Sequence, residues 1–345
     1  MNNDRTEISS LGEFGLIDHL TRNIELQHVS SVLGVGDDAA VIDHFGKQTV
    51  VSTDLLIEGV HFDLGYTPLK HLGYKSVVVN LSDIYAMNAT PTQITMSIGI
   101  SNRFGLEALD EFYEGVYAAC SAYQVDLVGG DTTSSSKGFV ISVTAIGEVT
   151  PGLFVKRSTA RKGDLLCVSG DLGGAYVGLL FLEREKRIFM ESPGVQPDLE
   201  NETYVIGRLL KPEARRDIVD FFAEQNILPT AMMDISDGLS SEILHICKDS
   251  NLGCVLYEDK IPVSEDMKKA AFKFEIDPTA CALSGGEDYE LLFTVSQEEY
   301  EKLVLNENIS VVGYMTDAEE GANIITRGGS RHPITAQGWN ALKGS

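Results

Sequence analysis

Strand-like and helix-like runs alternate along the whole of this chain of 345 residues, and this alternation restricts its fold more than any other feature. Apolar alternation predicts strands over Thr49–Thr53, Gln93–Ile100, Val140–Val149, Asp164–Ser169 and Glu290–Val295. Helical spacing of apolar residues predicts helices over Gly12–Asn23, Leu69–Met87, Leu106–Tyr123, Gly173–Glu185, Arg215–Gln225 and Leu239–Ser250. The mixture predicts an α/β or α+β fold.

The length exceeds what a single ordinary core organises, so we expect two domains. A turn-forming sequence at Thr150-Pro151-Gly152 follows a β-rich first half and predicts domains over residues 1–150 and 151–345. The polar stretch from Arg184 to Thr203 predicts a surface excursion within the second domain.

The formal net charge of -24 argues against a nucleic-acid or anionic-membrane partner, because both need basic patches. A phosphorylated small molecule remains compatible with this charge if metal ions lie between protein and ligand. The five cysteines are scattered without a C-x-x-C pair, which favours a reducing compartment over disulfides or a zinc site. With a polar N-terminus and no apolar run of membrane-spanning length, the expected location is the cytoplasm.

Acidic residues recur beside glycine or other small residues, at predicted strand ends or helix starts. The motifs are Gly36-Asp37-Asp38-Ala39-Ala40, Ser52-Thr53-Asp54, Asn80-Leu81-Ser82-Asp83, Gly129-Gly130-Asp131-Thr132, Asp234-Ile235-Ser236-Asp237-Gly238 and Gly285-Gly286-Glu287-Asp288. Mg²⁺ prefers carboxylate oxygens together with water and substrate phosphates. Tight loops would let these carboxylates converge from distant parts of the chain, so the set predicts a magnesium-dependent site that handles phosphate.

Each motif also has a simpler structural explanation. Asp237 has the position of a helix N-cap, Asp54 that of a turn residue after a strand, and Asp83 that of a solvated helix end. The adjacent Asp37 and Asp38 fit this explanation least, because neighbouring carboxylates repel each other unless a cation is near. Taken together, the motifs favour the metal interpretation.

The segment from Gly34 to Ala39 imitates the dinucleotide fingerprint G-x-G-x-x-A, with Asp54 at a plausible ribose-binding distance. Too few residues separate Ala39 from the next strand for a crossover helix, and two carboxylates would repel a pyrophosphate. No G-x-x-x-x-G-K-[ST] motif and no protein-kinase motif set occurs in the sequence. If the chain is a kinase, it holds ATP in another way.

The ordered set of motifs resembles the thiamine-monophosphate kinase family. The resemblance rests on Gly36–Ala40, Ser52–Phe62, Asn80–Met87, Gly129–Thr133, Met233–Leu239 and Gly285–Leu291. It departs from the family pattern at Tyr85, at Asn88, where Gly is usual, and in Lys211-Pro212-Glu213-Ala214-Arg215. None of these departures falls on an expected ligand.

The resemblance implies the two-domain α/β fold of aminoimidazole ribonucleotide synthetase, in which the N-terminal sheets of two chains pair into a barrel, and hence a homodimer. It implies an N-terminal domain that binds ATP and Mg²⁺ and a C-terminal domain that completes the active site. It also implies transfer of phosphate from ATP to thiamine monophosphate, with several Mg²⁺ ions and thiamine diphosphate as product. The acceptor phosphate is largely ionised near neutral pH, so no general base is required.

The resemblance assigns roles residue by residue. The implied metal ligands are Asp37, Ser52, Thr53, Asp54, Asp83, Asp131, Asp234 and Asp237. The implied ATP contacts are Gly130, Asp131, Arg157, Ser236 and Tyr113, and the implied thiamine-phosphate contacts are His61, Glu287 and Trp339. Simpler roles exist for several of these: a surface ion pair for Arg157, a buried histidine for His61, a loop turn for Glu287 and an anchor of the C-terminal tail for Trp339.

Two groups of proteins are alternatives to this interpretation. Among relatives, a selenophosphate synthetase would need a reactive N-terminal cysteine, and a hydrogenase-maturation relative would end in cysteine; this chain has its first cysteine at Cys120 and ends in Ser345. A purine-pathway synthetase is a further superfamily alternative. A non-catalytic divalent-cation-binding protein would cluster its carboxylates in one loop, as an EF-hand does, whereas here they are spread from Asp37 to Asp288.

Overall fold

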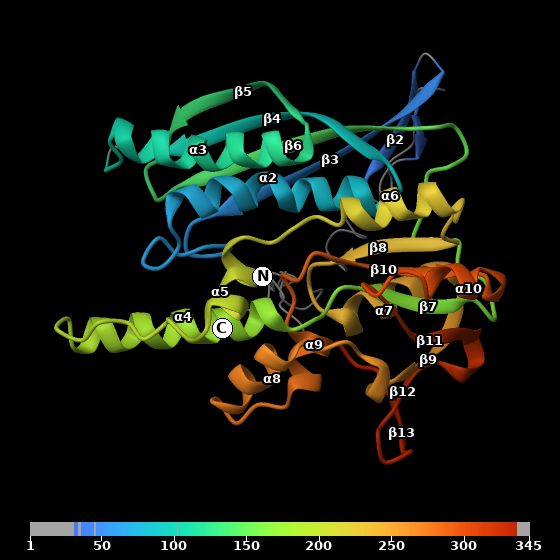
Figure 1. Ribbon diagram of the computed structural model, residues 1–345. Helices are drawn as coiled ribbons and strands as arrows, with labels where there is room; N and C mark the ends of the chain where they lie inside the picture. Colours follow the sequence, from blue (N-terminus) through green and yellow to red (C-terminus); the bar gives the residue numbers. More distant parts are fainter. Residues whose placement is uncertain (1–30, 34–35, 45, 102, 337–345) are drawn as a thin grey trace, which may run out of the picture.

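The computed structural model describes residues 31–33, 36–44, 46–101 and 103–336 of the chain. The described chain forms two sheets in two layers (Figure 1), a six-stranded sheet in the order β1-β2-β3-β6-β4-β5 and a seven-stranded sheet in the order β13-β12-β9-β11-β7-β10-β8. Helices are interspersed with the strands in both parts. The predicted α/β class is confirmed.

The first part of the chain builds the six-stranded sheet and two long helices. Its elements are β1 (Ser31–Leu33), β2 (Ala40–His44), β3 (Lys47–Ile57), α2 (Leu69–Ala86), β4 (Thr90–Ile100), α3 (Leu106–Tyr123), β5 (Asp126–Ser134) and β6 (Val140–Val149). The pairs β2–β3, β3–β6 and β4–β6 are antiparallel, and β4–β5 is parallel. Helix α3 connects the two parallel strands, and β5 lies at one edge of the sheet.

Helix α2 lies between the two sheets. It contacts β3, β4 and β6 of the first sheet and β8 of the second, and side chains are buried along nearly its whole length. A helix that is apolar all round is favoured only where it is covered all round. Where α2 crosses α3, a Cβ at Gly73 would lie 1.9 Å from the Phe112 carbonyl oxygen and a Cβ at Gly115 would lie 1.8 Å from that of Lys70. The two glycines allow the helix backbones to touch.

The second part of the chain builds the seven-stranded sheet. Its strands are β7 (Leu165–Ser169), β8 (Ala231–Ile235), β9 (Leu252–Tyr257), β10 (Glu290–Val295), β11 (Ile309–Asp317), β12 (Ala322–Ile325) and β13 (Arg331–Pro333). Its helices are α4 (Gly174–Glu191), α5 (Thr203–Leu210), α6 (Arg216–Gln225), α7 (Leu239–Ser250), α8 (Glu265–Phe272), α9 (Pro278–Ser284) and α10 (Tyr300–Leu303), with short 3₁₀ turns η2 (Glu258–Lys260), η3 (Gln297–Glu299) and η4 (Ala318–Glu320).

The predicted elements largely coincide with observed ones, and the predicted helix Gly12–Asn23 lies outside the described residues. The main correction concerns the stretch Arg184 to Thr203. Its first part is not an excursion, because α4 continues to Glu191, and Thr203 already begins α5. The reason is local: the segment from Arg184 to Glu191 consists mostly of good helix formers and contains no glycine or proline before Pro193.

Asn88, one of the departures from the family pattern, has a clear structural setting. Its φ of 56° places it in the left-handed region directly after the C-cap of α2. Asparagine adopts this region more readily than most residues with a side chain. The Asn88 side-chain amide also donates a hydrogen bond of 2.9 Å to the Leu153 carbonyl, so the substitution leaves the turn intact.

Candidate active site

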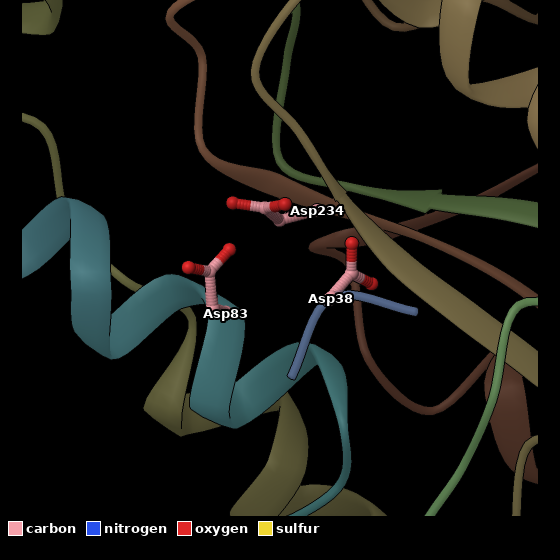
Figure 2. A group of neighbouring side chains, drawn as sticks. All are labelled: Asp38, Asp83 and Asp234. Atoms are coloured by element: carbon pink, nitrogen blue, oxygen red, sulfur yellow. The ribbon is translucent and has the colours of Figure 1, made fainter. Parts of the chain in front are cut away.

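Three carboxylates from distant parts of the chain meet between the two sheets. Asp38 precedes β2, Asp83 lies on α2 and Asp234 lies on β8, and Figure 2 shows their side chains pointing toward one another. One oxygen of each lies within 4.8 Å of the others. One of the two Asp38 carboxylate oxygens, Oδ2, is buried and has no hydrogen-bond partner among the described residues. Oxygen ligands converging in this way, with one left unsatisfied, fit a hard divalent cation.

The electrostatics of these three residues, here called the acidic cluster, point the same way. Burial raises the pKa of Asp83 well above its ordinary value, and the charges of Asp54 and Asp234 add to the rise. Burial likewise raises the pKa of Asp38 well above its ordinary value, although Arg157 opposes the shift. Burial also raises the pKa of Asp234. Burial and the neighbouring negative charges disfavour the ionised form of these carboxyl groups. A bound cation stabilises the ionised form, because it offsets both the desolvation and the repulsion.

Asp37 and Asp38 are adjacent in sequence but make different contacts. Both Asp37 oxygens accept hydrogen bonds from the Arg157 backbone N–H, at 3.1 and 3.2 Å. The Arg157 guanidinium then reaches Asp37 at 3.3 Å and Asp38 at 2.5 Å. Asp37 therefore anchors the segment that links the two sheets, while Asp38 keeps one oxygen for the acidic cluster. Arg157 forms a largely buried ion pair here rather than a surface one.

The motif Asn80-Leu81-Ser82-Asp83 assembles the site from the middle of α2. Asn80 accepts a hydrogen bond of 3.0 Å from the Asp54 backbone N–H. The Ser82 hydroxyl donates to Asp234 across the layers at 2.7 Å, and Asp83 accepts from Ser52 at 2.6 Å. One helix thus positions β3 on one side and β8 on the other. Asp83 is not a solvated helix end, since α2 is buried on both sides.

Strand alternation separates the residues of the Ser52-Thr53-Asp54 motif. Ser52 and Asp54 point toward α2, whereas the Thr53 hydroxyl donates to the Val143 carbonyl at 3.0 Å and the Thr53 side chain is exposed. Asp54 lies within β3 rather than in a turn after it. Burial and the charges of Asp234 and Glu287 raise the pKa of Asp54 to about 6. A metal contact from Thr53 would have to use its backbone carbonyl.

A cavity of about 900 Å³ opens beside the acidic cluster, between the two sheets. Asp83 and Asp234 line it, and so do five predicted site residues: Asp54, His61, Ser236, Asp237 and Glu287. Clefts of roughly 300–1,000 Å³ between structural units are typical sites for small molecules. The cavity therefore joins residues predicted to hold metal, ATP and the second substrate.

The sequence matches two family models in succession. "AIR synthase related protein, N-terminal domain" matches residues 36–149, and "AIR synthase related protein, C-terminal domain" matches residues 161–327. Thiamine-monophosphate kinase of Bacillus subtilis (strain 168) is 32% identical over 342 residues, which cover 96% of this chain and 100% of the relative. The chain belongs to the thiamine-monophosphate kinase family. The resemblance drawn from the ordered motifs is thereby confirmed.

Other members of the family agree. The thiamine-monophosphate kinase of Aquifex aeolicus (strain VF5) is 35% identical over 332 residues, with 96% of this chain and 98% of the relative covered. A solved structure of AaThiL complexed with AMPPCP and TMP matches with a TM-score of 0.82 at 32% identity, over 98% of this chain and 99% of that one. Hydrogenase maturation protein HypE in complex with ATP, at 19% identity and a TM-score of 0.68, shows a shared fold.

Within this family fold, the remaining predicted ATP contacts lie apart from the acidic cluster. Tyr113, Gly130 and Asp131 line a second pocket of about 470 Å³ along β5. The sheet order β3-β6-β4-β5 puts this strand three positions from Asp54. Asp131 is exposed there. The described chain brings these three residues together, but does not bring Asp131 to the other predicted metal ligands.

The turns that carry the last two motifs interlock. The Glu287 backbone N–H donates to the Ser236 carbonyl at 2.7 Å, and a Cβ at Gly286 would lie 2.6 Å from the same oxygen. Asp237 does not cap α7, because Gly238 is the N-cap residue. Instead, the Asp237 N–H donates to Glu242 at 2.8 Å.

The His61 side chain lines the cavity, and its Nδ1 accepts a hydrogen bond of 2.9 Å from the Ile57 N–H. Trp339 lies outside the described residues. Asp38, Asn80 and Ser82 lie within the acidic motifs of the sequence, but their roles in the site follow only from the contacts seen in the structure. Among the described helices, none combines the length and hydrophobicity that a membrane span requires.

Proposed function

We propose that this chain transfers the terminal phosphate of ATP directly to the phosphate of thiamine monophosphate, giving ADP and thiamine diphosphate. The observation that carries the proposal is the acidic cluster at the wall of a cavity between the two sheets, in a chain of this family. The family's named activity and the solved AaThiL complex with AMPPCP and TMP support the same pair of substrates.

The chemistry asks for positioning and charge neutralisation rather than a base. The nucleophile is a substrate phosphate oxygen, which is mostly ionised near neutral pH, and no side chain in the cavity needs to accept its proton. Mg²⁺, held by Asp38, Asp83 and Asp234, would neutralise the two polyanions and favour in-line transfer. Ser52, Ser82 and Asn80 keep the carboxylates and β3 in place for this purpose.

The other metal and ATP assignments stay predictions. Asp37, Thr53, Asp131 and Asp237 are proposed as further metal ligands beside Ser52 and Asp54, and Arg157, Ser236, Gly130 and Tyr113 as ATP contacts. The Arg157 guanidinium now contacts Asp37 and Asp38. To bind ATP, it would have to release or share these contacts and donate the same N–H groups to a phosphate, which accepts them in the same bidentate way.

The remaining proposals concern substrate, assembly and location. His61, Glu287 and Trp339 are proposed to contact thiamine monophosphate. The face of the six-stranded sheet that carries Thr53 and Leu55 is left open by α2 and α3 (Figure 1), with Leu55 52% exposed, which supports pairing of two chains into a homodimer. The domain boundary at residues 150/151 and a cytoplasmic location are likewise proposed.

A product assay tests the activity. Purified protein is incubated with ATP and either thiamine or thiamine monophosphate, with Mg²⁺ or with EDTA, and the products are separated by chromatography. We expect thiamine diphosphate only from thiamine monophosphate and only with Mg²⁺. Mg²⁺ binding without turnover of either substrate would instead favour a cation-binding protein and refute the proposal.

A further inference from the structure

Lys75 is a buried cation in a cavity otherwise lined by acidic, polar and apolar side chains. Its side chain is 7% exposed, and among the described residues that line the cavity it is the one lysine or arginine. Removing an ammonium group from water is strongly unfavourable unless it is paired. A lysine buried in this position therefore needs a partner of opposite charge.

The partners of Lys75 both come from the second part of the chain. Its Nζ contacts a carboxylate oxygen of Glu287, Oε2, and donates to the Leu209 carbonyl at 3.1 Å. Leu209 lies in the last turn of α5, where carbonyl oxygens without intrahelical partners favour a cation. These two contacts hold the ammonium group between the end of α5 and the turn that carries Glu287.

Helix α2 sets the distance between this ion pair and the acidic cluster. Lys75, Val79 and Asp83 follow one another at four-residue intervals, and all three line the cavity. Residues at that spacing share one face of a helix, and eight residues of helix span about 12 Å. The Lys75–Glu287 pair and Asp83 of the acidic cluster are therefore separated along α2 within one cavity.

Glu287 is held so that its second oxygen is available. The residue has a φ of 62°, a left-handed conformation that its side chain does not favour, and its backbone is bonded to Ser236. Among the described residues, the second oxygen, Oε1, accepts one hydrogen bond of 3.3 Å, from the Tyr289 hydroxyl. The Glu287 side chain remains 33% exposed toward the cavity. Lys75 takes one oxygen and leaves the other for a donor on a ligand.

We propose that Lys75 is a positioning residue for substrate recognition: it fixes Glu287 so that the free oxygen accepts a hydrogen bond from an amino group at the end of the substrate remote from its phosphate. For the substrate of the proposed function, on which this inference rests, that group is the amine of the aminopyrimidine. Lys75 itself does not touch the substrate.

The proposal differs from two other roles that Lys75 can be given. As a crosslink between the two parts of the chain, it would affect stability and both substrates alike. As a direct phosphate ligand, it would affect turnover without regard to the amino group. Only a positioning role predicts an effect that is confined to recognition of the amino group and that depends on Glu287.

The experiment measures KM for each substrate and kcat in wild type, K75M, E287Q and the double variant, with K70M as control. Lys70 lies on the same helix, but is 56% exposed and paired with Glu114. We expect K75M to raise KM for thiamine monophosphate about tenfold or more, the effect of disturbing a charged hydrogen bond, with KM for ATP nearly unchanged. In the E287Q background, K75M should add less than about twofold, because residues that act through one another are not additive.

A substrate analogue separates this inference from the proposed function. Wild type should use thiamine monophosphate much better than the analogue that lacks the amino group, and K75M should lose most of this preference. Wild type that makes no thiamine diphosphate refutes the proposed function. Wild type that is active but shows no preference, or additive effects of K75M and E287Q, overturns only the role of Lys75.

Stability decides the remaining case. If K75M does not fold, K75Q, whose amide still donates a hydrogen bond, undergoes the same measurements. If neither variant folds, Lys75 is a structural crosslink and the proposal is overturned.

Discussion

Two buried acidic regions of this molecule differ in how their charge is compensated. In the acidic cluster, Asp38, Asp83 and Asp234 face one another, and one Asp38 oxygen has no partner in the described part of the chain. In the second sheet, Glu290 is equally buried, yet its oxygens accept from Arg208 at 3.0 Å and from Arg215 at 2.5 Å. Two arginines compensate Glu290, whereas in the described chain Asp83 and Asp234 face Asp38 beside a cavity without an arginine between them. Buried acids in one fold therefore differ in the partners that packing supplies.

The largest expected effect comes from breaking the acidic cluster. D38N should lower kcat about 10²–10³-fold, as the loss of one preorganised charge-stabilising group does elsewhere, since the remaining oxygens hold the cation less well. Tm without Mg²⁺ should stay equal or rise, because one repulsive charge has gone. Steady-state kinetics and a thermal melt measure both. D43N, on an exposed residue of β2, is the control; a folded D38N with normal kcat would contradict the assignment.

The same change in the compensated region should have the opposite signature. E290Q removes the carboxylate that two arginines and the Ser169 hydroxyl share. Removing this charged partner of two buried arginines costs about 3–5 kcal/mol, which chemical denaturation would measure as a lower free energy of unfolding. E224Q, on an exposed part of α6, should change nothing. If E290Q were as stable as wild type, the region would not be self-compensating.

Mg²⁺ and pH sharpen the comparison. Burial, with the charges of Asp234 and Glu287, raises the pKa of Asp54 from 3.8 to about 6. A carboxyl with a higher pKa in the folded state binds more protons when folded, so it lowers the free energy of unfolding as the pH rises through this window. A cation removes that loss by favouring the ionised carboxylates.

The increase in Tm produced by Mg²⁺ should therefore be a few degrees larger near pH 7.5 than near pH 5.5. This estimate rests on the rule that a change of about 1 kcal/mol in the free energy of unfolding shifts Tm by a few degrees. Thermal melts with Mg²⁺ and with EDTA at each pH measure it. D38N should lose most of the increase, whereas E224Q should keep it. An increase that is independent of pH would mean that the carboxylates do not share a cation.

The smallest effect belongs to a residue that only orients a cluster member. S82A removes the hydroxyl that donates to Asp234 at 2.7 Å and should lower kcat or Mg²⁺ affinity about 10–100-fold, the usual range for a group behind a ligand. S76A is the control, since Ser76 is on the same helix and its hydroxyl donates to the Gly73 carbonyl of that helix rather than to a carboxylate. Equal losses in S82A and S76A would indicate damage to α2 itself.

Much of the fold was within reach of the sequence. The strands β3, β4, β6, β7 and β10 and the helices α2, α3, α6 and α7 fall where apolar periodicity predicted them. Periodicity reports the pattern of burial along one element, and these elements are regularly covered. The end of α4 was missed because surface polarity suggested a loop where helix propensity prevailed. Segments such as β12 and β13 are short, and their side chains are mostly only partly buried or exposed, which leaves little pattern to detect.

The site divides in a similar way. The motifs and the resemblance pointed to Asp83 and Asp234 and, of the adjacent pair, to Asp37, whereas the structure brings Asp38 into the acidic cluster. That choice depends on Arg157, which lies more than a hundred residues away in the chain and occupies Asp37 with its backbone N–H. Loop positions were expected for the acidic residues, yet Asp54 and Asp234 lie within strands and Asp83 lies within a helix. Regular elements hold their side chains more rigidly than loops do.

By itself, the sequence determined the family, because residue type and local spacing are written in the chain as an ordered series of acidic motifs. The tertiary structure decided which of those acids remain uncompensated. It placed Asp38 beside Asp83 and Asp234, and it placed Lys75 with Glu287 in the cavity that Asp83 and Asp234 also line. Compensation depends on partners brought from distant segments by packing, and the energy of a buried charge depends on those partners more than on its neighbours in sequence.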